Sequence, residues 1–153
     1  MRISALSFVI AAASIALAPC AAVAQGKELP CVGYATFERD GPNTQLIGLA
    51  VGDIPEGAKV ILKCSGTSCP FAEKEFNLTS SVKTLALTDM FIDPNFKAGT
   101  TLEIRVTKPG WVGKAFQYDI RSSGEPRSST QCLSADGAKT VACAKETEAG
   151  HDK

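Results

Sequence analysis

Apolar and polar residues alternate along the chain from residue 32 onward, in short segments separated by Gly, Pro, Asn and Asp. Alternation with a period of two residues is typical of a β-strand that is buried on one face, and these four residue types favour turns. The pattern therefore predicts an all-β domain of short strands without a long helix. The predicted strands are residues 32–39, 44–51, 58–64, 71–78, 101–107, 115–121 and 129–133, with 141–143 pairing back on the last of them.

The alternation also predicts which side chains face the core. It is clearest over residues 101–107, and residues 115–121 should pair with this segment as a hairpin across a Pro-Gly turn. Residues 82–91 fit either a strand or one helical turn. Many short strands of this kind are typical of a single two-sheet antiparallel β-sandwich of the immunoglobulin-like class. The expected core-facing sets are Leu102, Ile104 and Val106; Phe116, Tyr118 and Ile120; Val60 and Leu62; and Ile47, Leu49 and Val51.

The first 24 residues have the three parts of a secretory signal peptide. Arg2 supplies the positive charge, residues 3–18 form the apolar run, and Ala22-Val23-Ala24 fits the small-residue rule for cleavage before residue 25. No later apolar stretch approaches the length of a membrane span. We therefore expect an exported protein, periplasmic or extracellular, without a transmembrane segment. A lipoprotein acylated at Cys20 is the alternative, but Pro19 stands where such signals normally have a small residue.

The composition is that of an ordinary globular domain. Sixteen Lys and Arg balance sixteen Asp and Glu over 153 residues, and 44% of the residues are hydrophobic. A disordered chain would be less hydrophobic and more highly charged, and a nucleic-acid-binding domain would carry a basic excess. We expect one domain over residues 25–144, a charged flexible tail over residues 145–153, and no nucleic-acid partner.

Five cysteines remain after the predicted cleavage, and export would place them in an oxidising compartment where disulfides persist. Ease of loop closure favours the local pairs Cys64–Cys69 and Cys132–Cys143, while other pairings stay open. The odd cysteine, Cys31, is then a buried thiol, a swapped partner or a link to another chain. Intervals of four and ten residues within these pairs match neither a zinc site nor a redox centre, so no metal and no cofactor are expected.

Two segments, taken together, resemble a small β module of exported and cell-surface bacterial proteins. Residues 49–60 read L-A-V-G-D-I-P-E-G-A-K-V and lead to C-S-G-T-S-C-P-F at 64–71, and residues 98–114 read A-G-T-T-L-E-I-R-V-T-K-P-G-W-V-G-K. The resemblance spans residues 44–143. Ala98, Trp111 and Val112 depart from the residues that are common in the module, and Cys31 is not part of its pattern. The resemblance implies a small extracytoplasmic β domain with no established activity, so it transfers no catalytic residue.

The candidate catalytic residues do not form a recognisable set. A hydrolase of the triad type needs a base beside its nucleophile, and the single histidine, His151, lies in the predicted tail. Carboxylate pairs can hydrolyse glycosides, but Glu73 with Glu75, and Glu103 with Asp119, occupy the polar positions of alternating strands. We expect these carboxylates to lie on a solvated face and the protein not to be an enzyme. A glycoside-acting enzyme is kept as an alternative.

The turn of the predicted hairpin is the strongest candidate for ligand binding. Trp111 follows Pro109-Gly110 directly, and Lys108 and Lys114 flank it. A tryptophan with neighbouring donors on a rigid hairpin can stack on a sugar ring or anchor a protein, or its ring can instead cover the open end of the sandwich. We therefore expect a non-catalytic binding or interaction module of the bacterial envelope or extracellular space, with an envelope glycan or a protein as partner. A structural subunit linked covalently through Cys31 is the second hypothesis.

Overall fold

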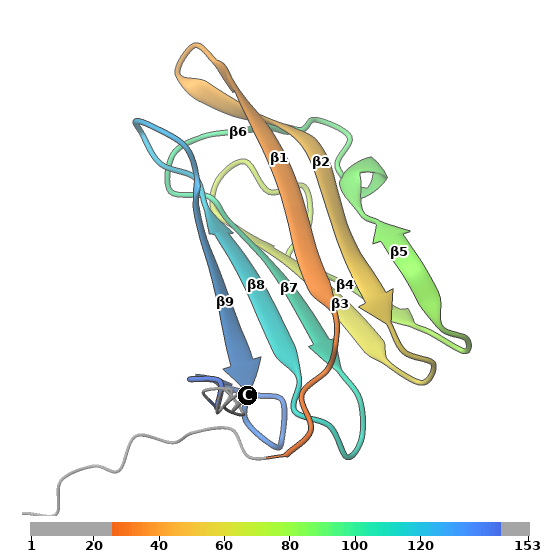
Figure 1. The fold of residues 1–153 in the computed structure, drawn as a ribbon. Helices are drawn as coiled ribbons and strands as arrows, with labels where there is room; N and C mark the ends of the chain where they lie inside the picture. The colour runs from red at the N-terminus through yellow and green to blue at the C-terminus, as the bar shows by residue number, and fades with distance from the viewer. Residues whose placement is uncertain (1–25, 145–153) are drawn as a thin grey trace, which may run out of the picture.

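The computed structural model describes residues 26–144, and the predicted signal peptide and tail lie outside this range. Within it the chain forms ten β-strands and one short 3-10 helix, η1 (Figure 1). The elements are β1 (Val32–Asp40), β2 (Asn43–Ile54), β3 (Lys59–Ser65), β4 (Glu73–Asn77), β5 (Val82–Ala86), η1 (Thr88–Met90), β6 (Asn95–Phe96), β7 (Thr101–Thr107), β8 (Lys114–Asp119), β9 (Arg127–Leu133) and β10 (Thr140–Val141).

The strands form two antiparallel sheets that face one another (Figure 1). The smaller sheet has the order β1-β2-β5, with β6 also paired to β2, and the larger has the order β10-β9-β8-β7-β3-β4. The prediction of an all-β domain with two antiparallel sheets is confirmed. The predicted β7–β8 hairpin and the return of β10 on to β9 are also present. No helix among residues 26–144 is long and apolar enough to cross a membrane.

The core lies between the two sheets and takes side chains from both. On β7, Leu102, Ile104 and Val106 are fully buried, as the alternation predicts. Phe96 on β6 is also fully buried and meets the ring of Phe91 edge-on, with 5.3 Å between the ring centroids. Burial of one such side chain stabilises the folded state by roughly 1.5–3 kcal/mol, so the core dominates the stability of the domain.

The prediction that Ile47 shares a buried face with Leu49 and Val51 is wrong. Ile47 is 44% exposed, whereas its neighbour Leu46 is 2% exposed. The register between β1 and β2 shifts at this point, so that Ile47 is the extra residue of a β-bulge. A bulge exchanges the two faces of a strand, and the residues on its two sides therefore follow opposite alternations.

The structure also differs from the prediction at the end of β2 and between residues 82 and 96. β2 continues past residue 51 to Ile54, which is buried and pairs with Val82 of β5. Residues 82–91, which fit a strand or a helical turn, contain one of each, because β5 is followed by η1. β6 was not predicted, since two residues are too few to show a periodic pattern.

Both local cysteine pairs form disulfides. Cys64–Cys69 closes the loop after β3, and Cys132–Cys143 joins β9 to the chain that follows β10. Cys31 forms no disulfide with any cysteine of residues 26–144. The second bridge encloses the β9–β10 turn, and this turn contributes to the site described next.

Candidate functional site

A groove of about 510 Å³ lies against the outer side of the larger sheet, at the end that carries the β7–β8 turn. Its walls come from the first residues of β3, the last residue of β4, the β7–β8 turn and the turn after β9. The lining residues are Gly57, Lys59, Ile61, Asn77, Thr107, Lys108, Pro109, Gly110, Trp111, Gly113, Ser134, Ala135, Asp136 and Gly137. Two of the lining residues, Lys108 and Trp111, are among those that the sequence offers for ligand binding.

Trp111 is held at the mouth of this groove by the geometry of its turn. Gly110 has φ 78°, a conformation that favours glycine, and the Trp111 backbone N–H donates to the Lys108 carbonyl at 3.1 Å. The indole ring is partly buried and packs against the core. Its remaining surface faces the groove, so the residue both closes the end of the core and borders the site.

Two ammonium groups lie over the Trp111 ring. The Nζ atom of Lys27 is 4.3 Å from the ring centroid, and that of Lys108 is 5.3 Å from it. Such cation–π contacts contribute about 0.5–1 kcal/mol each at exposed sites. Among residues 26–144, neither lysine forms an ion pair. The positive charge around Trp111 is therefore available to a ligand.

Lys27 reaches this position because the segment before β1 runs beside the β7–β8 turn. Glu28 and Val112 form a parallel bridge, in which the Val112 N–H donates to the Lys27 carbonyl at 2.9 Å and the Leu29 N–H to the Val112 carbonyl at 3.0 Å. Residues 25–30 show no strand pattern, and the sequence did not point to Lys27. The one feature of the sequence that could have indicated an ordered segment here is Leu29, a single apolar residue that is fully buried in the structure.

The structure does not bring Lys114 to the groove. Lys114 pairs with Val106 of β7 and Cys132 of β9, both fully buried, and cross-strand partners share a face of the sheet. Its side chain is therefore on the inner side of the larger sheet and does not line the groove. The sequence carried this signal, because Lys114 has the same alternation as Phe116 and Tyr118, which were assigned to the core.

The groove contains one further cation and one carboxylate. Lys59 is paired with Glu75, with 3.2 Å between Nζ and Oε2. Hydrogen bonds from the Ser134 hydroxyl and then from the Ala138 N–H hold the pKa of Asp136 below its usual range. Asp136 is thus a fixed negative charge at one wall, opposite in sign to the lysines at Trp111.

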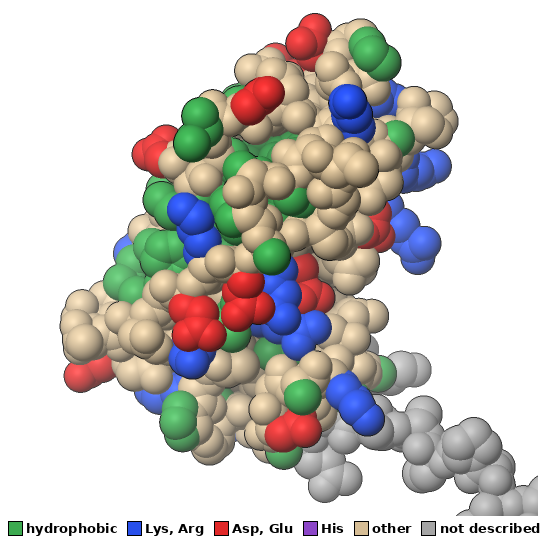
Figure 2. Space-filling model, turned by 180° about the vertical axis from the view of Figure 1, so that it is seen from behind, with side chains coloured by type: hydrophobic (Ala, Val, Ile, Leu, Met, Phe, Trp, Pro, Cys, Tyr) green, Lys and Arg blue, Asp and Glu red, His purple; other side chains and the backbone are tan. Residues whose placement is uncertain are grey.

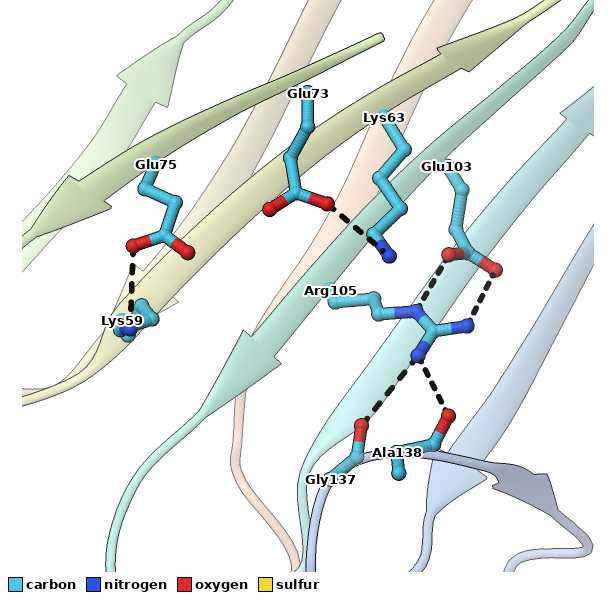
Figure 3. A network of polar contacts seen from close by, with 8 residues as sticks. All are labelled: Lys59, Lys63, Glu73, Glu75, Glu103, Arg105, Gly137 and Ala138. Carbon is cyan, nitrogen blue, oxygen red and sulfur yellow. Dashed lines mark hydrogen bonds and ion pairs between the residues drawn. The ribbon is translucent and has the colours of Figure 1, made fainter.

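The carboxylates that the sequence offered as catalytic pairs lie on the outer face of the larger sheet and interact with neighbouring side chains, and Figure 3 shows Glu73, Glu75 and Glu103 among them. Seen from behind, this face shows acidic and basic side chains interspersed across the middle of the molecule (Figure 2). The interactions are Glu73 with Lys63, Glu75 with Lys59, Glu103 with Arg105, and Asp119 with Thr101 and Gln117. This arrangement is typical of a solvated, salt-bridged sheet face.

Arg105 has a second role on this face, since it ties β7 to the turn that borders the groove. Besides Glu103, its guanidinium donates to the carbonyl oxygens of Ala138 at 3.0 Å and Gly137 at 3.4 Å (Figure 3). Hydrogen bonds from a charged donor are about twice as strong as neutral ones. Arg105 therefore positions the wall of the groove that carries Asp136.

One cluster has the composition of a metal site but not its chemistry. Ligand atoms of Glu28, Cys132 and Cys143 lie within 4.8 Å of one another. The two cysteines are disulfide-bonded, and a metal ligand must be a thiolate. The cluster therefore offers one carboxylate and no sulfur ligand.

Cys31 lies just before β1, with an exposed fraction of 1%. Of the three alternatives for this residue, a buried thiol matches the structure. Burial raises the pKa of the Cys31 thiol from 9.0 to about 11, against an opposing effect of the nearby Lys114 charge. A thiol in this state is protonated and shielded at neutral pH.

We expect Cys31 to be unreactive in the folded protein. At pH 8 the difference in alkylation by iodoacetamide between the protein and its Cys31→Ala variant should be close to zero when folded, and one thiol per chain after unfolding.

Because the unfolded thiol loses its proton from pH 9.0 and the folded one near pH 11, the free energy of unfolding should fall as the pH rises through this window. The Cys31→Ala variant should lack that part of the decline. Rapid alkylation of one thiol in the folded state would contradict the burial of Cys31.

Comparisons with known proteins identify no relative of this chain. No protein-family model matches the chain, no curated protein matches it, and no solved structure matches it.

Proposed function

We propose that this protein is an exported, non-catalytic binding module whose ligand occupies the groove at Trp111. The observation that carries the proposal is the pair of ammonium groups over the Trp111 ring, at 4.3 and 5.3 Å, without an ion pair among residues 26–144. An aromatic edge beside unpaired cations at a groove mouth suits a ligand that offers both an apolar surface and negative charge.

An acidic glycan of the cell envelope fits this chemistry best. The apolar face of a sugar ring can pack on the indole edge, while carboxylate or other anionic groups pair with Lys27 and Lys108. Lys59 lines the same groove and, although paired with Glu75, offers a third donor. The Asp136 carboxylate at the far wall would accept hydrogen bonds from sugar hydroxyls, so the groove has complementary groups for a whole sugar unit.

Four further observations bear on the proposal. Two disulfides in a small domain support export to an oxidising compartment, periplasmic or extracellular. The two facing antiparallel sheets support an immunoglobulin-like sandwich. The pairing of Glu73, Glu75 and Glu103 with basic residues supports a role without catalysis. The burial of Cys31 argues against a subunit that is linked covalently through this residue.

Co-sedimentation with insoluble acidic polysaccharides and envelope fractions tests the proposal. We expect Lys108→Glu to reduce the retained fraction at equal concentration, with a loss of affinity of about tenfold, because the substitution replaces an attraction by a repulsion. Lys74→Glu is the matched control, since the Lys74 Nζ also lies over an aromatic ring, that of Phe71, at 5.0 Å, but outside the groove. Lysine variants are cleaner than Trp111→Ala here, because loss of the indole also removes packing against the core.

Retention that is equal for the protein and Lys108→Glu would contradict the proposed site. No retention on any acidic material would contradict the proposed ligand class. Equal loss in Lys108→Glu and Lys74→Glu would show that general surface charge, and not the groove, is responsible.

A further inference from the structure

The two sheets are of unequal width, and the larger one extends beyond β1. β1 is the edge of the smaller sheet and lies over β8: a Cβ atom on Gly33 would come within 2.5 Å of the Phe116 ring, and the Phe37 and Tyr118 rings are 5.9 Å apart. β9 is the next strand beyond β8 in the larger sheet. No strand of residues 26–144 covers β9 from the side of the smaller sheet.

The inner face of β9 is consequently open. Ser128 pairs with Tyr118 and Thr130 with Phe116, so their side chains belong to the face that is core on β8. Both residues are exposed, whereas Tyr118 and Phe116 are buried. We call the place where the larger sheet extends past β1, so that β9 is uncovered, the step. A groove of about 580 Å³ lies in this step between β1 and β9, and it shares no residue with the groove at Trp111.

The edge that borders this step is long and unprotected. β1 has nine residues, and within residues 26–144 it pairs on one side only, with β2. It exposes Tyr34 (53%) and Val32 (42%). An edge strand presents unpaired N–H and C=O groups to any extended chain, and exposed apolar side chains on it favour such pairing.

We propose that one extended peptide segment of another protein adds to β1 as a further strand and lies over β9. Its main chain would pair with the free edge of β1, and every second side chain would point to the floor formed by Ser128 and Thr130. This surface is independent of the groove at Trp111 and goes beyond the proposed glycan binding.

The shape of the step selects a single strand and excludes a second copy of this chain. Neighbouring strands lie about 4.7–4.9 Å apart, so one strand beside β1 stands directly over β9. If β1 of a second copy took that place, its own larger sheet would have to occupy the position of β8 and β9. The overhang therefore blocks β1–β1 pairing while it leaves room for a peptide.

The chain's own terminal residues are a poor candidate for the same place. Residues 145–153 read K-E-T-E-A-G-H-D-K, and Glu, Lys, Ala, Gly and Asp are depleted in strands. A segment with β-branched residues at alternate positions suits the edge better, because its outer side chains would pack beside Tyr34 and Val32. Small side chains suit the inner positions, above the hydroxyl groups of Ser128 and Thr130.

Charge at one end of the step adds a requirement for the partner. Of the residues that the structure describes, Glu125 is the only charged one that lines the groove, and the adjoining hollow of about 290 Å³ adds Glu38 and Arg39. Arg39 donates to the Ser122 carbonyl at 2.9 Å, while neither carboxylate forms an ion pair among residues 26–144. A basic residue of the partner should lie here, which for antiparallel pairing with β1 is the N-terminal end of the segment.

The test uses a labelled nine-residue peptide, one lysine followed by alternating valine and serine, with the protein purified after expression of the full chain. We expect fluorescence anisotropy to show saturable binding and amide hydrogen exchange of β1 to slow by about tenfold at saturation. Replacement of the peptide lysine by glutamate should weaken binding about fivefold, as for one exposed ion pair. Thr130→Arg should weaken it by at least about tenfold, because the new side chain fills the floor of the groove.

Gln131→Arg is the matched control, since Gln131 is exposed on the opposite face of β9 and the charge change is the same. It should change affinity by less than about twofold.

Binding without protection of β1, or equal binding to Thr130→Arg and Gln131→Arg, would overturn the proposal. A dimer in solution with protected β1 amides, or β1 amides that lose protection on deletion of residues 145–153, would also overturn it by assigning the edge to another occupant. Lys108→Glu should not affect peptide binding, so failure of this proposal is distinguishable from failure of glycan binding.

Discussion

Replacement of Phe96 by alanine is expected to lower the free energy of unfolding by about 3–5 kcal/mol, as for other fully buried phenylalanines. Phe96 has no exposed surface, and its ring meets the ring of Phe91 edge-on. The ring centroids of Phe91 and Phe71 are in turn 5.1 Å apart. The alanine variant would leave a cavity at the centre of this aromatic cluster. The strand that carries Phe96, β6, has only two residues, so its place beside β2 depends on this side chain. Urea unfolding followed by circular dichroism measures the change.

Ile92 supplies the control for this prediction. It lies four residues before Phe96 and is 96% exposed. Ile92→Ala should change the free energy of unfolding by less than about 0.5 kcal/mol. Similar losses for the two variants would mean that the packing described around Phe96 is incorrect.

The second large effect is expected at the Cys132–Cys143 disulfide. Replacement of both cysteines by alanine should lower the free energy of unfolding by about 3 kcal/mol, the value that the chain-entropy relation gives for a loop of eleven residues. The loop contains residues 134–137, which form a wall of the groove at Trp111. Loss of the bridge should therefore also weaken ligand binding, and thermal unfolding with a binding measurement on the same variant tests both effects.

The Cys64–Cys69 disulfide is the matched comparison. Its loop is shorter, with a separation of five residues, so the same relation gives about 2 kcal/mol for its removal. This loop does not line the groove, and its loss should leave ligand binding intact. A larger effect of the Cys64–Cys69 removal on binding would contradict the assignment of the β9–β10 turn to the site.

The sequence predicts the strands that obey a strict alternation, because burial on one face imposes that pattern directly. Residues 101–107 were predicted as a strand and are β7 with the same bounds. The alternation did not locate the bulge at Ile47, because Leu46 and Ile47 are both apolar and only the pairing with β1 shows which of them faces the core. For the same reason β6 escaped notice, because it is ordered by its contacts with β2 and not by its own composition.

The sequence could indicate only part of the candidate site, because several groove residues come from segments that are distant along the chain. Trp111 and Lys108 are neighbours in sequence, so their turn could be recognised. Lys27 lies there because of the bridge between Glu28 and Val112, and the turn at 134–137 is held by the hydrogen bonds of Arg105, and both contacts join segments that are distant in the sequence. Lys114 was assigned to the site by proximity in sequence, although its alternation with Phe116 already placed it on the inner face. The unequal width of the sheets, on which peptide binding depends, has no signature along the chain.

Fluorescence of the single tryptophan tests the central claim most directly. Because Trp111 is the only tryptophan of the chain, its emission reports on the proposed groove and on no other site. Titration with a soluble anionic polysaccharide such as polygalacturonate should produce a saturable change in emission that is reduced by added salt and by Lys108→Glu, while neutral dextran should produce none. No change with the anionic polymer, or an equal change in Lys108→Glu, would contradict ligand binding at Trp111.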